Sequence, residues 1–467
     1  EPFDVEIAAH WQGAREPRQA LVWYRRAAKT AQRSLMLRQA VAANERAVEL
    51  MEGLLGLDGA PEKGPLQEPS TWPDGVGFGW GDYLSTLVAV GDLYEGFGEF
   101  EAAEKSYRGV VRCIGQETGR LNTDLLEVLA QSWLGLGHIA WQRGDFEGAE
   151  WAFARVRDLI KGLPELGEFD EDAARGRARV AWHRGDYEQA QELARQAHEA
   201  SAARGDDGGQ AESLWIFGEV ARMLGQGEKA RQFYDQSLEL YNNVNIPTGI
   251  ARNFLSMAQL ARYQKSFREA ENLYRRALTR YETLGDRRGG GQCFNGLGDV
   301  ARFRGLYSEA RVHYDRALEL YQAMGAEYDV AVVYANLGLT AIALGELGAA
   351  RLHLTAGRAL IAQKDYPYLV AGVEYNLALT DALAGEERES SATVARVLEL
   401  AERFPIPDLD YAQPLERLAE LRAEAGNATE AIALWRKARD IYGELDLTED
   451  QGRIAGKIED ASKTPVS

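Results

Sequence analysis

Cysteine is nearly absent from this 467-residue chain, and no part of it stays apolar for long. The two cysteines, Cys113 and Cys293, lie far apart, so the sequence predicts no disulfide framework. A reducing cytoplasm is therefore the compartment that we expect. No apolar run approaches the ~20 residues that a membrane-spanning helix needs. We accordingly expect no membrane insertion.

The common signatures of catalytic and metal sites are also missing. The sequence has no Gly-x-x-x-x-Gly-Lys-Ser/Thr loop, no His-Glu-x-x-His, no calcium loop and no Cys-x-x-Cys pair. The run Gly289-Gly290-Gly291 lacks a following Lys-Ser/Thr and predicts a turn. The six histidines occur singly, which favours packed or surface roles over metal binding. We therefore predict no catalytic residue, metal or cofactor, and no enzymatic activity in this chain.

The chain has fewer basic than acidic residues. Asp and Glu number 72 against 53 Lys and Arg, for a net charge of -19 and a pI near 5.0. Such a balance argues against nucleic acid or an anionic membrane as the general partner. With so many carboxylates, paired acids arise by chance on helix surfaces, and a solvated face explains them.

What the sequence does contain is a repeat of about 40 residues. A large apolar residue precedes a small one at Gly218, Ala258 and Gly298, and subtracting successive positions gives 40 both times. The second half of each unit carries an alanine and a tyrosine: Ala230 and Tyr234, Ala270 and Tyr274, Ala310 and Tyr314. A fixed period in this range indicates a solenoid.

The spacing has a direct physical interpretation. Small residues in a first helix let a second helix approach closely, and an alanine followed by an aromatic four residues on lies along one stripe of that second helix. The pattern thus predicts antiparallel helix hairpins. One hairpin cannot bury its apolar face alone, so neighbouring hairpins must stack.

This pattern resembles the tetratricopeptide repeat, in which Leu-Gly opens the first helix motif and Ala-x-x-x-Phe/Tyr-x-x-Ala marks the second. Leu297-Gly298, Ala310, Tyr314 and Ala317 carry the likeness most clearly. The usual repeat has about 34 residues, and the extra length here falls at the end of the second helix, as in the lengthened repeats of scaffold and regulator proteins. The resemblance implies an all-α fold, a right-handed superhelical α-solenoid of stacked antiparallel helix hairpins.

The repeat extends well beyond its clearest units. The small first-helix residues are Gly91, Gly137, Ala178, Gly218, Ala258, Gly298, Gly338, Ala378 and Ala419. Their second-helix partners are Ala103, Ala149, Ala190, Ala230, Ala270, Ala310, Ala350, Ser390 and Ala431. The two series predict nine hairpins. Glycines in the turns between paired helices, such as Gly144 and Gly305, are expected to end the first helix in the left-handed conformation.

Four parts of the chain follow from these patterns. They are a helical lead-in at 1–53, a Gly/Pro-rich loop at 54–78, nine hairpins at 79–447, and a capping helix and tail at 448–467. The loop is expected to be either an irregular excursion or a lid over the groove, with Trp72, Phe78 and Trp80 as anchors.

The first residues carry a second resemblance. Ala9-His10-Trp11 and the stretch from Ala20 to Ala27 are similar to the lead-in of repeat tails in large bacterial signalling proteins, where a serine/threonine kinase or signalling ATPase domain precedes the repeats. The chain starts Glu1-Pro2 without an initiator Met. We therefore expect it to be a piece of a longer protein.

A line of arginines is the main candidate site. In such stacks the first helices line the concave face, and four residues past the small positions stand Trp141, Trp182, Arg222, Arg262, Arg302 and Ile342. The three arginines recur at the repeat period, and guanidinium groups bind carboxylate or phosphate in bidentate geometry. The alternative is that Glu219 and Asp299, one turn back, pair with them.

Other candidates lie on the same expected face. Arg252, Arg175 and Arg179 occupy neighbouring turns, while Trp182, Trp215, Tyr263 and Phe303 are expected to supply apolar pockets. Asn336 and Asn376 resemble the asparagine with which peptide-clamping repeats bind a peptide backbone, and Asn295 stands one residue out of that register. Hydrogen bonds between helices are the structural alternative for these asparagines.

Three functions are compatible with this sequence. The first is a non-catalytic scaffold that binds a peptide or partner segment in its groove, an acidic partner being favoured by the arginines. The second is a regulatory sensor or substrate-docking tail of a larger kinase or signalling ATPase. The third is a receptor for a small signalling peptide. Replacing all three arginines with glutamate is expected to abolish binding without unfolding the protein.

Overall fold

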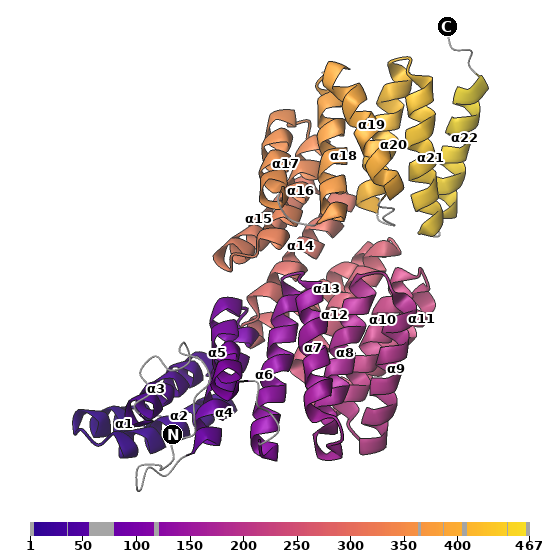
Figure 1. Ribbon diagram of the computed structural model, residues 1–467. Helices are drawn as coiled ribbons and strands as arrows, with labels where there is room; N and C mark the ends of the chain where they lie inside the picture. The colour runs from indigo at the N-terminus through magenta and orange to yellow at the C-terminus, as the bar shows by residue number, and fades with distance from the viewer. Residues whose placement is uncertain are drawn as a thin grey trace. The chain divides into compact units, whose positions relative to one another are not determined.

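In the part of the chain that the structure describes, the protein is built of α-helices (Figure 1). The computed structural model describes residues 4–34, 36–55, 79–115, 121–362, 366–385, 387–403, 409–445 and 447–463. Within these ranges the structure has 22 α-helices, a short 3-10 turn at Pro164–Leu166 and no strand. The prediction of an all-α fold is confirmed.

The bounds of the helices show regular lengths along the chain. The first eleven are α1 (Asp4–Gly13), α2 (Pro17–Arg33), α3 (Leu37–Leu55), α4 (Trp80–Gly96), α5 (Phe100–Ile114), α6 (Thr123–Gln142), α7 (Phe146–Ile160), α8 (Gly167–His183), α9 (Tyr187–Arg204), α10 (Asp207–Met223) and α11 (Gly227–Asn243). The others are α12 (Pro247–Tyr263), α13 (Phe267–Leu284), α14 (Arg287–Phe303), α15 (Tyr307–Ala323), α16 (Glu327–Ala343), α17 (Leu347–Ile361), α18 (Pro367–Leu383), α19 (Glu387–Arg403), α20 (Leu409–Glu424), α21 (Ala428–Glu444) and α22 (Thr448–Lys463).

The chain divides into two compact units, a division that the repeat pattern did not indicate. Unit 1 contains Glu1–Val220 and Glu239–Val244, and unit 2 contains Ala221–Leu238 and Asn245–Ser467. The boundary therefore passes through α10 and α11, in the middle of the regular repeats.

Successive helices pack as hairpins, and the hairpins stack. The pairs α4–α5, α6–α7 and α8–α9 make such contacts in unit 1, and α12–α13, α14–α15, α16–α17, α18–α19 and α20–α21 make them in unit 2. First helices of neighbouring hairpins also touch, as α6 touches α8 and α14 touches α16. Helix α22 packs against α21 and buries Ile454, so its remaining polar surface caps the stack.

A buried aromatic ring fills the space between neighbouring hairpins. In α7, Phe153 is fully buried. A Cβ added to Gly137 of its own hairpin would lie 2.6 Å from that ring, and one added to Gly176 of the next hairpin would lie 2.5 Å from it. Tyr107 is held in the same way between Gly91 and Gly135. The glycines are therefore the only residues that leave room for the ring.

Most turns inside the hairpins follow the expected glycine rule. The seven predicted turn glycines have φ between 70° and 82°: Gly144, Gly185, Gly225, Gly305, Gly345, Gly385 and Gly426. In the turn between α12 and α13, Lys265 adopts φ 56° in place of a glycine. The left-handed helix ending predicted from the sequence is confirmed at these positions.

The outcomes for the remaining parts are mixed. The lead-in forms the helices α1, α2 and α3. Residues 56–78 lie outside the described residues, and with them Trp72 and Phe78, whereas Trp80 is buried at the start of α4. Both cysteines are buried and unpaired. No helix among the described residues is long and apolar enough to cross a membrane.

Candidate partner-binding surface

Three arginines lie at the ends of consecutive first helices in unit 2, and we call them the arginine line: Arg222 of α10, Arg262 of α12 and Arg302 of α14. Each guanidinium stands over an aromatic ring. Arg222 and Arg262 both lie over Tyr263, at 5.6 and 4.6 Å from the ring centroid. Arg302 lies over Phe303 at 4.4 Å. The rings attract the cations by cation–π interaction and restrict the movement of the guanidiniums.

The arginine line is not an open cationic surface. Arg262 and Arg302 are each only 8% exposed, so the expectation that they lie on an exposed side is wrong, whereas Arg222 is partly exposed. Asp299 lies 3.6 Å from Arg262 and 3.9 Å from Arg302. Arg302 also pairs with Asp410 of α20. The alternative raised for the sequence, pairing with Asp299, is therefore what the structure shows for these two arginines.

Asp299 is the centre of this network. Burial raises its pKa to about 6, although Arg262 and Arg302 favour the charged form. The Tyr314 hydroxyl donates a hydrogen bond to Asp299 at 2.8 Å, and Arg302 Nε donates to the same hydroxyl at 3.2 Å. For Arg302, burial lowers the pKa, but the carboxylates of Asp410 and Asp299 outweigh that effect and keep it raised.

The candidate asparagines Asn336 and Asn376 form hydrogen bonds within the helix stack. Asn336 is buried, and its Nδ2 donates to Asn295 Oδ1 at 3.0 Å and to Asp299 at 3.2 Å. Asn376 is also buried and donates to the carbonyl of Gly372 in its own helix at 2.9 Å. Among the described residues, its Oδ1 has no hydrogen-bond partner. For Asn336, the helix-to-helix hydrogen bond is therefore the observed arrangement, while Asn295 stays partly exposed.

The basic candidates of unit 1 are also paired. Arg175 is buried, donates to Ser201 Oγ at 3.0 Å and pairs with Asp172. Arg179 approaches His138 Nε2 at 3.0 Å and Glu212 at 3.4 Å. Arg252, in α12 of unit 2, is partly buried.

Aromatic rings replace the arginines along the first helices of unit 1. Trp182 lies 5.9 Å from Trp215 and 4.3 Å from His183, measured between ring centroids. Trp141 lies 5.4 Å from His183, and Phe146 stacks on His183 at 5.5 Å. Trp215 is buried, but Trp182 and Trp141 are partly exposed and His183 is exposed. The rings form a continuous apolar cluster with an accessible side.

Sequence reasoning did not find Asp410. It follows Arg302 by 108 residues, and no motif distinguishes it from the other carboxylates of the chain. Tertiary packing within unit 2 brings Asp410 of α20 to Arg302 of α14, and no local spacing encodes that contact. The sequence also did not indicate that Asp299 is buried, although it did show that Asp299 lies one turn before Arg302.

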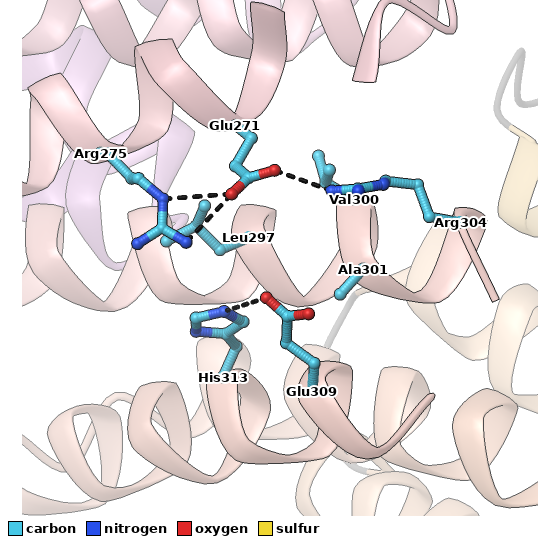
Figure 2. Close-up of a pocket in the computed structure, with 8 residues that line it drawn as sticks. All are labelled: Glu271, Arg275, Leu297, Val300, Ala301, Arg304, Glu309 and His313. Atoms are coloured by element: carbon cyan, nitrogen blue, oxygen red, sulfur yellow. Dashed lines mark hydrogen bonds and ion pairs between the residues drawn. The ribbon is translucent and has the colours of Figure 1, made fainter. Parts of the chain in front are cut away.

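A pocket lies elsewhere, among α13, α14 and α15 (Figure 2). Its empty volume is about 180 Å³, which is small for a ligand site. The charged side chains at its rim pair with one another: Glu271 with Arg275 at 3.0 Å and with Arg304 at 2.8 Å, and His313 with Glu309 at 3.7 Å. Burial lowers the pKa of His313. The arginine line does not contribute to this pocket.

The part of the chain that the structure describes contains no group of side chains typical of a metal-binding site. No three His, Cys, Asp or Glu side chains within it are grouped so that they could hold a metal ion.

The helix hairpins, the repeat and the stacked first helices define an α-solenoid, and comparison with known proteins identifies the kind of repeat in its middle part. The family model of the tetratricopeptide repeat matches residues 169–243, 209–283 and 249–323. Successive matches start 40 residues apart, from 169 to 209 and from 209 to 249, as the sequence period requires. Residues 169–323 therefore consist of tetratricopeptide repeats.

Solved structures support the same fold. A Rap protein complexed with competence and sporulation factor is 13% identical, with a TM-score of 0.51 over 72% of this chain and 98% of that chain. Aspartyl phosphate phosphatase F from Bacillus subtilis is 15% identical, with a TM-score of 0.51 over 78% of this chain and 94% of that chain. No curated protein matches the sequence. The resemblance of the first residues to kinase tails stays a prediction.

Proposed function

We propose that the protein is a non-catalytic interaction scaffold whose arginine line receives an acidic segment of a partner protein. The observation that carries this proposal is the stacking of three guanidiniums on aromatic rings at the ends of α10, α12 and α14. Guanidiniums fixed in this way bind carboxylates with little loss of side-chain freedom. In a chain with a net charge of -19, such a line is a local exception that favours acidic partners.

The neighbouring side chains support a segment rather than an isolated ion. Tyr263 and Phe303 are partly exposed beside the guanidiniums, so apolar residues of a partner have rings to pack against. The Rap protein of similar fold was crystallised with competence and sporulation factor, which supports a signalling-peptide receptor as the second candidate. We expect the acidic groups of either kind of ligand to lie at the arginine line.

A selection of random peptides on the purified chain tests this function. Peptides that bind are expected to be rich in Asp and Glu, and their affinity should fall by about tenfold or more in Arg222→Gln, because a hydrogen bond between charged groups is lost. Arg222 is the position to change because glutamate at 302 would face Asp299 and Asp410 and unfold the site. Fluorescence anisotropy measures the affinities.

Arg231→Gln is the matched control. Arg231 lies on the second helix α11 and pairs with Glu269 at 2.9 Å, so the same charge is removed away from the first-helix face. The control should bind as the unmodified chain does. Selected peptides that are not acidic, or that bind Arg222→Gln unchanged, would contradict the proposed function. Weaker binding at higher salt should accompany the charged mode.

A further inference from the structure

The last helices of unit 2 cover part of the arginine line. Asp410 of α20 pairs with Arg302 of α14 across 108 residues of sequence. Asp450 of α22 pairs with Lys265, in the turn after α12, across 185 residues at 2.6 Å. Both contacts join an acidic side chain of the C-terminal helices to a cation beside the line. The Asp410 carboxylate lies where the proposed function places a carboxylate of the partner.

Apolar contacts follow the same path. Phe303 of α14 and Ile342 of α16 pack against the hydrophobic core that α18 to α22 form. At the turn between α10 and α11, Gly225 lies beside the carbonyl oxygen of Glu444, so that an added Cβ would be 3.5 Å away. The C-terminal helices therefore meet the turns or ends of the helices that carry all three arginines.

The strength of these contacts fits a reversible cover. The pair of Lys265 and Asp450 is partly solvated, with 40% and 24% of the side chains exposed, and such pairs contribute little. The pair of Arg302 and Asp410 is buried, but its desolvation offsets most of the attraction. Exchanging Asp410 for the carboxylate of another molecule leaves the charge balance around Arg302 and Asp299 unchanged.

From this geometry we propose that α20 to α22 occupy the arginine line in cis, and that an acidic partner segment binds by taking the place of Asp410 on Arg302. The inference rests on the proposed function and adds its regulation. The partner must carry a carboxylate beside apolar residues, because Asp410 is followed by Tyr411, which packs beside Tyr375 at 5.9 Å between ring centroids. Binding then requires the C-terminal helices to move away from α12 and α14.

The test uses the full chain and a short fluorescein-labelled peptide of alternating Glu and Leu, with its Gln counterpart as the uncharged probe. Asp410→Asn removes the internal competitor and is expected to raise affinity for the Glu peptide by about tenfold or more. Asp450→Asn, which leaves Arg302 untouched, should raise it by about two- to fivefold. The Gln peptide should not respond to either change. Circular dichroism checks that both variants fold.

Asp440→Asn is the matched control. Asp440 is exposed on α21 and pairs only with its neighbour Arg439 at 2.7 Å among the pairs that the structure describes, so the same charge is lost without touching the cover. Spin labels at the exposed positions Arg268→Cys and Glu449→Cys report the movement, since both native cysteines are buried. The distance between labels should lengthen when the Glu peptide saturates the chain.

Each outcome decides between the claims. Equal affinity of the unmodified chain and Asp410→Asn, or an unchanged label distance at saturation, overturns the cis cover. If the peptide still binds and Arg222→Gln weakens it, the proposed function stands without the cover. If the Glu peptide binds neither the unmodified chain nor Asp410→Asn, two claims are overturned: that α20 to α22 compete with a partner, and that the partner is acidic. Tighter binding in both Asp variants with separation of the labels supports the inference.

Discussion

The two units carry different chemistry at the same position of the repeat. Four residues past the small residue, unit 1 has Trp141 and Trp182, whose rings both pack against His183 and stay partly exposed. Unit 2 has Arg262 and Arg302, which are buried and paired with carboxylates. One backbone register thus supports either an apolar or a charged line. The charged line is possible because acids neutralise it, Asp299 from α14 itself and Asp410 from α20.

A second position makes the comparison closer. Directly after the small glycine, unit 1 has Asp92 and unit 2 has Asp299. Each accepts a hydrogen bond from the tyrosine of its own second helix, Tyr107 at 2.6 Å and Tyr314 at 2.8 Å. Burial raises the pKa of both aspartates to about 6. The surroundings differ, since Glu95 lies near Asp92 whereas two arginines flank Asp299.

The largest expected effect is at Arg302. Arg302→Met keeps most of the side-chain volume but leaves Asp299 and Asp410 without their shared cation, so unit 2 should lose about 3–5 kcal/mol of unfolding free energy. Trp182→Met, at the same repeat position in unit 1, should cost less because that ring is partly exposed. Urea unfolding measures both, and hydrogen exchange locates the loss in α14 and α20. A larger loss of unfolding free energy in Trp182→Met than in Arg302→Met would contradict this expectation.

Packing between hairpins should be the same in both units. Alanine at Gly135 would collide with the buried ring of Tyr107, and alanine at Gly296 would place its Cβ 2.3 Å from Tyr274 of the preceding hairpin. Each change should cost about 1–3 kcal/mol in thermal or urea unfolding, since neither ring can move away. Gly348→Ala is the control, because nothing lies within 4 Å of its added Cβ, and it should be neutral or slightly stabilising.

The last expected effect depends on pH and separates the two aspartates. Because the pKa of Asp92 is about 6 in the folded chain and near 3.9 when unfolded, its contribution to stability is full below pH ~4 and is lost as pH rises through ~6. Asp92→Asn should therefore gain up to about 3 kcal/mol relative to the unmodified chain at pH 7 but not at pH 4. Urea unfolding at both pH values measures the difference.

Asp299→Asn is the comparison in unit 2. It would leave Arg262 and Arg302 with one carboxylate fewer, and this loss should outweigh the gain from removing a buried charge. The variant is expected to be less stable than the unmodified chain at pH 7. Stabilisation by both substitutions would show that the arginines do not depend on Asp299.

Much of the fold could be predicted because the local spacing of small and aromatic residues determines it. The period of the small residues located the hairpins, and the lead-in helix at Pro17–Arg33 was placed correctly. The glycines two residues before the small positions, Gly135 and Gly296, were not singled out, although they face the tyrosine of the preceding hairpin. Their role depends on how one hairpin rests on the next, which a single repeat does not reveal.

The candidate site was predictable only in part, for a related reason. The arginine line and Asp299 share helices or a repeat period, so the sequence brought them together. The arrival of Asp410 at Arg302 depends on a contact across 108 residues, which no local spacing encodes.

The rings between hairpins also have a mechanical consequence. Since Tyr107 and Phe153 each touch glycines of two neighbouring hairpins, the diameter of one ring sets the rotation from one repeat to the next. In a stack where each repeat contacts only its neighbours, a small change at one ring displaces the hairpins that follow it in unit 1. A substitution at such a ring would therefore change how the next hairpins of this unit are oriented while leaving the local helices intact.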